Sequence, residues 1–404
     1  MVGPTTLNSV VLIALAAAMA PLLAQAFGRW ISIPSTVIEI VLGIVIGPAA
    51  LGIAHKDDFV NTLSNFGLVL LFFLAGYEVD FTRIKGGPLT RAASSWAVSL
   101  VLGLAIGALL ALMVGSGAAG GFTIGLALTT TALGAILPIL RDAGTLPTPL
   151  GAQTMAVGAV GEFAPLVAVA VLLSGRAPLR SIVVLGVFAL IAVGAAILAV
   201  RPMPPRMSRA ITVTLGTSGQ FAVRLIVLVV LALVWLATRL DLDVILGAFA
   251  AGITIRLLLN STGEREIETI ESKIDGLAFG LFIPFFFVVT GIGFDLRALV
   301  SSASAIALVP IGLVAFMVVR GLPVGFAFRR HLPAPELKAL RLYAATELPL
   351  VVVITGIGVD NDWLTAATAA GLVGAAMLSV LLYPLLALRS TAPSSVTATA
   401  TVVP

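Results

Sequence analysis

The chain has 404 residues, of which 59% are hydrophobic and 10% charged, and its formal net charge is +4 at pH 7. Its mean hydropathy of +1.15 is far above that of water-soluble proteins and indicates an integral membrane protein. Cysteine is absent, and the two histidines, His55 and His331, form no metal-binding motif. We therefore expect no enzymatic activity and no cofactor.

The apolar stretches are too long for the strands of an outer-membrane barrel and do not alternate, so helices are expected to cross the membrane. Runs of about 18 or more apolar residues predict an all-α polytopic protein with about 13 transmembrane helices. These cover residues 7–27, 33–54, 61–80, 92–114, 121–140, 151–173, 181–200, 222–239, 243–259, 276–294, 302–328, 339–358 and 363–388. No basic segment precedes the first, which favours a true span over a signal peptide. Residues 391–404 are predicted to be a disordered cytoplasmic tail.

Lysine and arginine predict the orientation of the chain. With loops assigned to alternate sides, roughly sixteen basic residues fall on one side and roughly five on the other. The positive-inside rule makes the basic side cytoplasmic, with the N-terminus outside and the C-terminus inside the inner (plasma) membrane. This bias accounts for the pI of 9.8, so the expected partner is the lipid bilayer and not nucleic acid.

The third and tenth predicted helices resemble each other. At an offset of 215 residues, Phe72 matches Phe287, Gly76 matches Gly291 and Asp80 matches Asp295. The helices before them share a looser pattern, with Gly43 and Gly47 in one and Gly247 and Gly252 in the other. Because the paired helices are seven apart, an odd number, they cross in opposite directions and the repeat is inverted. Inverted repeats are typical of secondary transporters, whose substrate binds near the bilayer midplane.

Two predicted helices contain residues that favour a break. The fifth carries Thr129, Thr130 and Thr131 before Gly134 and Pro138, and the twelfth carries Thr346, Glu347 and Pro349 before Gly356. The repeat makes these helices partners, and carbonyls and hydroxyls at such breaks can replace the hydration shell of a cation. Alternatively, the threonines bond to helix carbonyls and Pro349 makes an ordinary kink.

Five ionisable residues lie within predicted spans: Glu39, Glu78, Glu162, Arg320 and Glu347. Glu162 is nearest the bilayer midplane, where a charge costs roughly 3 kcal/mol or more. Burial disfavours the charged form of a carboxyl, so a proton and a metal cation can compete for Glu162, and this competition couples their fluxes. Arg320 is the expected counter-charge, either for Glu162 or for another buried carboxylate.

The other three carboxylates have weaker claims to a transport role. Glu347 lies beside a predicted break and is expected to have a structural or electrostatic role there. Glu78 lies at the cytoplasmic end of its helix, where it can pair with Arg83 or extend to the membrane surface. Glu39, about two turns from the same face, is undecided between a structural and a transport role. Glu39 and Glu78 are therefore kept as possible cation or proton sites.

Five stretches resemble the monovalent cation:proton antiporter-2 family, which includes Kef-type and bacterial Na⁺/H⁺ exchangers. They cover residues 33–53, 66–81, 242–253, 283–296 and 342–358, in the family's order. The resemblance implies a homodimer with elevator-type alternating access and two crossed, discontinuous helices, the fifth and the twelfth. It also implies core helices within residues 61–173 and 276–388 and dimerisation or scaffold helices within residues 1–54 and 181–259.

The sixth predicted helix departs from the family's pattern. The family carries Asp preceded by Asn, Asp or Gln, whereas this chain has Gly161 and Glu162. The resemblance places Glu162 on the essential acid and Arg320 on a basic residue that interacts near its neighbour. A single carboxylate favours the exchange of one cation for one proton. The chain lacks the nucleotide-binding domain of Kef-type members, so gating by such a ligand is not expected.

These patterns predict an antiporter that exchanges Na⁺ or K⁺ for H⁺, with Glu162 as the shared site and Thr129, Thr130 and Thr131 as further ligands. A gated cation channel and an uptake symporter of the same fold are alternatives. A non-transporting scaffold or sensor is a third, supported by the missing side chain at Gly161. Ion selectivity and transport direction do not follow from the sequence, because oxygen ligands serve Na⁺ and K⁺ alike.

Overall fold

The computed structural model describes residues 4–28, 33–79, 86–172, 178–200, 213–214, 217, 219–259 and 263–391. Within these residues, nine helical stretches are long and apolar enough to cross a membrane, and four shorter apolar helices accompany them. Each of the predicted spans coincides with one of these stretches, so the all-α polytopic prediction is confirmed. Apart from its first residue, the predicted tail lies outside the described residues.

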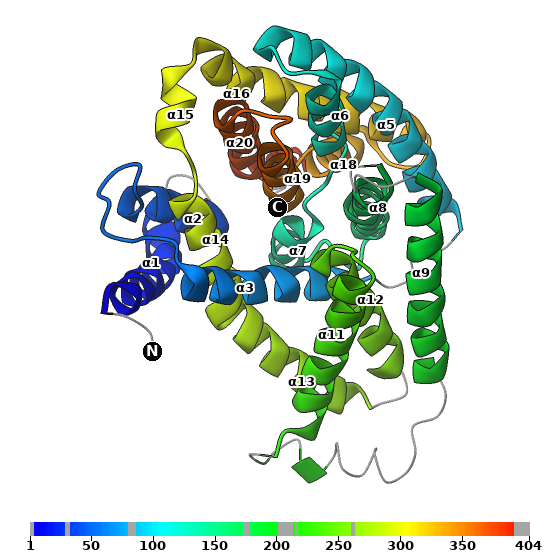
Figure 1. Ribbon diagram of the computed structural model, residues 1–404. Coiled ribbons are helices and arrows are strands. Elements are labelled where there is room, and N and C mark those ends of the chain that lie inside the picture. The colour runs from blue at the N-terminus through cyan, green and yellow to red at the C-terminus, as the bar shows by residue number, and fades with distance from the viewer. Residues whose placement is uncertain are drawn as a thin grey trace, which may run out of the picture.

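The described helices keep the chain order of the prediction (Figure 1). They are α1 (Pro4–Gly28), α2 (Ser35–Ile46), α3 (Asp58–Tyr77), α5 (Gly87–Val114), α6 (Ala118–Ala127), α7 (Leu133–Asp142), α8 (Pro149–Leu172), α9 (Pro178–Val200), α11 (Phe221–Arg239), α12 (Val244–Leu259), α13 (Glu264–Leu277), α14 (Ile283–Ile292), α15 (Leu296–Ser301), α16 (Ala303–Phe316), α17 (Leu322–Phe328), α18 (Ala334–Ala344), α19 (Pro349–Asp360) and α20 (Ala366–Thr391), with the π-helical segments η1 (Ala278–Phe282) and η2 (Met317–Gly321).

Local sequence explains two boundaries that differ from the prediction. The second helix was expected to reach residue 54, but α2 ends at Ile46 because Gly47 and Pro48 follow. The third was expected from residue 61, but α3 begins after Asp57, whose side chain accepts a hydrogen bond from the Val60 N–H at 2.9 Å. Hydrogen bonds from the Thr6 side chain and the Val60 N–H hold the pKa of Asp57 below its usual value.

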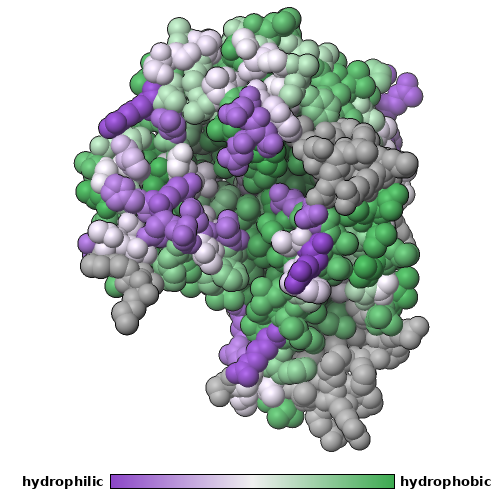
Figure 2. All heavy atoms as spheres, in the orientation of Figure 1, coloured by the Kyte–Doolittle hydropathy of each residue, from purple (hydrophilic) through white to green (hydrophobic). Residues whose placement is uncertain are grey.

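The helices gather into two halves (Figure 1). The crossover half contains α5–α8 and α16–α20, and the scaffold half contains α1–α3 and α11–α14. Figure 2 shows hydrophilic residues around a hollow between the halves, whereas the flank along α9 is largely hydrophobic. Leu190 on α9 is 73% exposed and Leu112 on α5 is 80% exposed. Apolar exposure of this extent is typical of a surface that faces lipid.

Glycines bring the helices of the scaffold half together in two equivalent ways. A Cβ added at Gly252 on α12 would collide with the backbone carbonyl of Phe73 on α3. At the equivalent place in the other repeat, a Cβ at Gly43 on α2 would collide with the carbonyl of Val288 on α14. Phe73 and Val288 differ by the same 215 residues as the matched sequence positions. The two crossings are thus related by the predicted repeat, and small residues permit both close approaches.

This packing bears on the predicted division into domains, which assigned α3 and α14 to the moving core. Both helices lie in the scaffold half of Figure 1. Through the glycines just described, α3 contacts α12 and α14 contacts α2. Helices joined by such close backbone contacts resist sliding past each other. We therefore expect α3 and α14 to stay with the scaffold helices, and the remaining division stays a prediction.

Candidate functional site

The two predicted breaks cross inside the crossover half. α6 ends at Ala127 and α7 begins at Leu133, while α18 ends at Ala344 and α19 begins at Pro349. Between them, the Ala132 N–H donates to the Thr346 carbonyl at 2.8 Å. The Thr131 hydroxyl donates to the Ala344 carbonyl at 2.7 Å. The unwound segments 128–132 and 345–348 therefore satisfy part of each other's freed backbone groups, and both predicted breaks are confirmed.

The threonines at the breaks are buried, but they bond differently. Thr129 and Thr346 each donate to a carbonyl three or four residues earlier, as the structural alternative expected. The Thr130 hydroxyl lies 3.0 Å from the Ala127 carbonyl three residues earlier, but it also reaches the second break, where it lies 2.7 Å from Oε2 of Glu347. Thr130 and Thr131 therefore hold the two breaks together, whereas the hydroxyls of Thr129 and Thr346 support their own helices.

Glu162 lies in the middle of α8, beside the first break. The Thr131 N–H donates to the carbonyl of Gly161 at 3.0 Å, which fixes this part of α8 against the unwound segment. The Glu162 side chain is 1% exposed, and its Oε2 has no hydrogen-bond partner. A buried carboxyl oxygen without a partner is costly unless a proton or a cation can occupy it. The Glu162 side chain is thus buried in the middle of its helix, and its depth in the bilayer stays a prediction.

Arg320 lies on the π-helical segment η2 between α16 and α17 and is 1% exposed. Its guanidinium donates to neutral oxygens: Thr131 Oγ1 from Nε at 3.0 Å and Nη2 at 2.8 Å, Thr130 O at 3.2 Å, and Ser99 Oγ and Val157 O at 3.4 Å. The ion pairs among the described residues do not include one between Arg320 and Glu162. Arg320 therefore does not form the direct contact with Glu162 that was one of its two expected roles.

The missing side chain of Gly161 has a structural reason. A Cβ added there would lie 2.6 Å from Thr131 Oγ1 and would collide with Nη2 of Arg320. The guanidinium thus fills the space beside α8 that a larger residue at position 161 would need. Glycine in place of the family's Asn, Asp or Gln at position 161 therefore leaves room for the Arg320 guanidinium.

Glu347 is a second fully buried carboxylate, at the crossing itself. Its Oε2 accepts from Thr130, its Oε1 has no hydrogen-bond partner, and its backbone N–H donates to Ser379 Oγ on α20 at 2.9 Å. The sequence reasoning did not single out Ser379 or Ser99. Each serine lies within an apolar helix, and no local pattern distinguishes it from a serine bonded only to its own helix.

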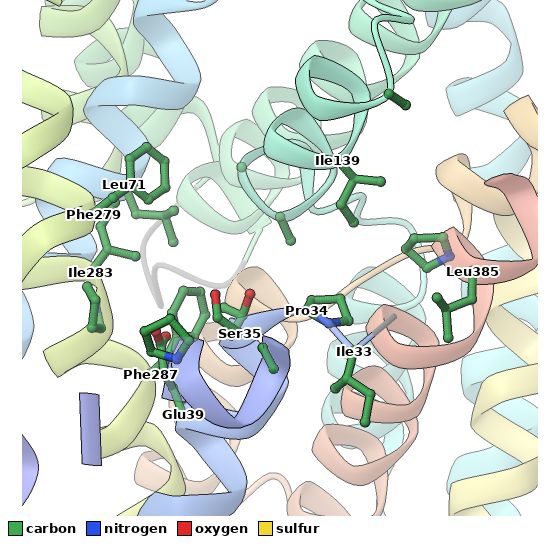
Figure 3. A pocket seen from close by; sticks show the side chains of 18 of the residues that line it. Ile33, Pro34, Ser35, Glu39, Leu71, Ile139, Phe279, Ile283, Phe287 and Leu385 are labelled. Carbon is green, nitrogen blue, oxygen red and sulfur yellow. The ribbon is translucent and has the colours of Figure 1, made fainter. Parts of the chain in front are cut away.

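Glu39 faces a cavity of about 590 Å³ between the two halves (Figure 3). In that view Ser35 and Glu39 of α2 line one side, across from Ile139 of α7. Most of the lining is apolar, and among the described residues that line the cavity Glu39 is the single charged one. The Glu39 side chain is 5% exposed. A carboxylate in an otherwise apolar cavity creates a local preference for cations.

Glu78 has a different environment. It caps the C-terminal end of α3 and forms an ion pair with Arg141 of α7 at 2.5 Å. Arg141 also contacts Asp275 on α13 at 3.3 Å. The predicted partner, Arg83, lies outside the described residues. Glu78 therefore forms part of an ionic contact between the two halves and not part of the buried crossing.

The sequence profile described as "Sodium/hydrogen exchanger, transmembrane" matches residues 13–388. The chain belongs to this family. The family resemblance drawn from the five stretches is thereby confirmed, and the inverted repeat, the crossed breaks and the buried Glu162 belong to a sodium/hydrogen exchanger domain.

Relatives and a solved structure agree with this assignment. The chain is 26% identical over 404 residues to the putative Na⁺/H⁺ antiporter YjbQ of Bacillus subtilis, covering 94% of this chain and 62% of that protein. It is 27% identical over 271 residues to the Na⁺/H⁺-K⁺ antiporter GerN of Bacillus cereus, covering 64% of this chain and 65% of that protein. The chain thus spans less than two thirds of the length of these relatives.

The sodium proton antiporter MjNhaP1 of Methanocaldococcus jannaschii has a similar structure, with a TM-score of 0.68 and 16% sequence identity. The similarity covers 96% of this chain and 97% of that one. It confirms the predicted antiporter-like fold.

Proposed function

We propose that the chain exchanges a monovalent cation, Na⁺ or K⁺, for H⁺ across the plasma membrane, with Glu162 as the site that both ions share. The observation that carries this proposal is the buried Oε2 of Glu162, which has no hydrogen-bond partner and lies beside an unwound segment. Names of relatives, such as the Na⁺/H⁺-K⁺ antiporter of Bacillus cereus, support the same activity.

The chemistry at Glu162 is a competition. With a proton bound, the carboxyl is neutral and tolerates its buried position. When a cation replaces the proton, the carboxylate charge is balanced by the cation, again without a net charge at the site. Either loaded form can be moved through the membrane, whereas the empty carboxylate is costly, so flux of one ion requires flux of the other.

Arg320 supplies a fixed positive charge in this proposal. It is held by neutral oxygens and stays at its place beside Gly161 whichever ion Glu162 carries. The buried Glu347, linked to Arg320 through Thr130, balances that charge within the crossing. Because Glu162 is then the carboxylate that changes its ligand, we propose one cation for one proton. We favour transport over the scaffold alternative, which rested on Gly161, because Arg320 gives the missing side chain a structural reason.

The cavity containing Glu39 provides the route from one membrane face. It is lined by Gly134 at the start of α7. The next residue inward, Leu133, is fully buried and would contact a Cβ at Gly158, one turn before Glu162. We propose that ions enter past Glu39 and that Leu133 closes the path to Glu162. Movement of the crossover half against the scaffold half would open the path to the other face.

Proteoliposomes with an imposed pH gradient test this function. Adding Na⁺, K⁺ or Li⁺ in turn should trigger proton movement with wild type and fail to do so with Glu162→Gln. Glu162→Asp, which keeps the carboxylate, should retain part of the activity. Glu268→Gln, which removes an exposed carboxylate on α13, is the matched control and should behave like wild type. Unchanged transport by Glu162→Gln would overturn the proposal, as would continuous currents above carrier turnover.

A further inference from the structure

A second feature, separate from the buried crossing, is a groove of about 640 Å³ between α5 and α17. α5 lies at the outer edge of the molecule (Figure 1). The described residues that line the groove include three arginines and one histidine and no carboxylate: Arg91, Arg329, Arg330 and His331. A concentration of positive charge without an acidic partner is unfavourable by itself and favours an anionic ligand.

The basic residues are arranged close together at one end of the groove. Nη1 of Arg91 lies 3.1 Å from Nε2 of His331. Since an arginine can only donate, Nε2 of the imidazole accepts this hydrogen bond. Nε of Arg91 is buried and has no hydrogen-bond partner. Arg329 and Arg330 are exposed beside them. The exposed guanidinium groups of Arg329 and Arg330 can therefore donate to an incoming anion.

The other end of the groove is apolar and faces outward. Val98 and Leu102 of α5 and Leu322 of α17 line it, and Phe326 of α17 joins it to the basic end, with its ring centroid 4.1 Å from the guanidinium carbon of Arg329. Val98, Leu322 and Phe326 are 51%, 47% and 68% exposed. An exposed apolar wall directly beside a basic cluster has the two-part character of a phospholipid.

The dimensions fit a lipid in one leaflet. Arg91 lies in the first two turns of α5, and Arg329 to His331 directly follow α17, so the basic end is at the ends of two membrane-spanning stretches. From Arg91 to Leu102 the helix rises about 16 Å. That is close to half of the roughly 30 Å hydrocarbon core of a bilayer. The basic end would thus meet a headgroup and the apolar wall one acyl chain.

We propose that this groove binds an anionic phospholipid, with its phosphate held by Arg91, Arg330 and His331 and an acyl chain along Val98, Leu102 and Phe326. The predicted orientation places the basic end at the cytoplasmic leaflet, which carries anionic lipid. The proposal does not depend on the transport function. α5 also carries Ser99, which accepts a hydrogen bond from Arg320 and lies about two turns along the helix from Arg91 at the basic end of the groove.

Native mass spectrometry of the full chain in detergent, with phosphatidylglycerol titrated in, tests the site. Wild type should retain bound lipid, and phosphatidylcholine should bind much more weakly. Two basic residues at an anionic surface contribute about thirtyfold in affinity, so Arg91→Gln/Arg330→Gln should weaken binding by about that factor. Arg330→Gln alone alters an exposed residue and should weaken it by about fivefold.

The matched control is Arg265→Gln/Arg389→Gln, which removes two exposed arginines on α13 and α20. It should bind phosphatidylglycerol as wild type does. An equal loss in the control would show general surface charge and overturn the proposal. A second experiment adds inorganic phosphate at millimolar concentration to test whether the groove binds a soluble phosphate in place of a lipid. If it displaced the lipid, or bound in the groove when the lipid did not, the occupant would be a soluble phosphate and the proposal would be wrong.

Discussion

A methyl group at position 161 would test how Arg320 is held at the crossing. In Gly161→Ala the new Cβ would approach Thr131 Oγ1 to 2.6 Å and collide with the guanidinium, so Arg320 would have to move. Its two hydrogen bonds to Thr131, at 3.0 and 2.8 Å, would be lost. A hydrogen bond to a charged group contributes about 1.5–3 kcal/mol, whereas alanine in place of glycine inside a helix gains about 1 kcal/mol. The expected net loss of stability is about 2–5 kcal/mol.

Thermal unfolding in detergent measures this loss, with Gly186→Ala as the matched control. Gly186 lies on α9, and a Cβ there would meet no atom within 4 Å, so helix propensity alone should act and the midpoint should stay or rise. Gly161→Ala should unfold at a lower temperature than wild type and transport more slowly. A midpoint for Gly161→Ala at or above that of Gly186→Ala would refute the role assigned to the guanidinium.

Gly43→Ala and Gly252→Ala should each lower the thermal midpoint by a similar amount, because each Cβ meets a backbone carbonyl of the neighbouring helix and overpacking costs about 1–3 kcal/mol. A large loss in one variant and none in the other would contradict the repeat-related packing. Glu39→Gln should raise the apparent KM for the cation on the cavity side by about tenfold, with Glu268→Gln unchanged, because a charged cleft concentrates its counter-ion. An unaltered KM would exclude the entry role. The pKa of Asp57 is lower in the folded protein, so this carboxylate stabilises the fold at pH values above its unfolded-state pKa of about 3.9. That contribution is lost as the pH falls through the lower, folded-state pKa. Unfolding of Asp57→Asn followed from about pH 6 to 3 should therefore depend less steeply on pH than that of wild type, and equal slopes would contradict this.

The breaks and the buried acid could be predicted from the sequence because their signals are local. Polar residues followed by glycine or proline inside an apolar run, as at Thr130 and Glu347, indicate a broken helix in a membrane. The depth of Glu162 follows from counting residues along its span. The polar helix α13 was missed because hydropathy selects only apolar runs. Its isoleucines Ile267, Ile270 and Ile274 have the spacing of one buried helix face and were the available signal.

Contacts between distant helices could not be predicted, because a repeat shows which positions are equivalent but not which ones meet. The sequence matched Gly43 and Gly252 only as members of a loose pattern, whereas the structure gives them equivalent backbone contacts. Likewise, the choice of Arg320 between Glu162 and neutral oxygens depends on where Thr131 and Ser99 lie in space. Such choices are made by tertiary packing, which one sequence does not reveal.

The claim that a proton and a cation compete for Glu162 is tested most directly by proton release from purified protein. Na⁺ or K⁺ is added to the protein in lightly buffered detergent solution, and the pH change and the bound cation are measured together. The account predicts that wild type releases a proton with each cation it binds, and that Glu162→Gln releases none. Cation binding by wild type without proton release, or equal release from Glu162→Gln, would contradict it.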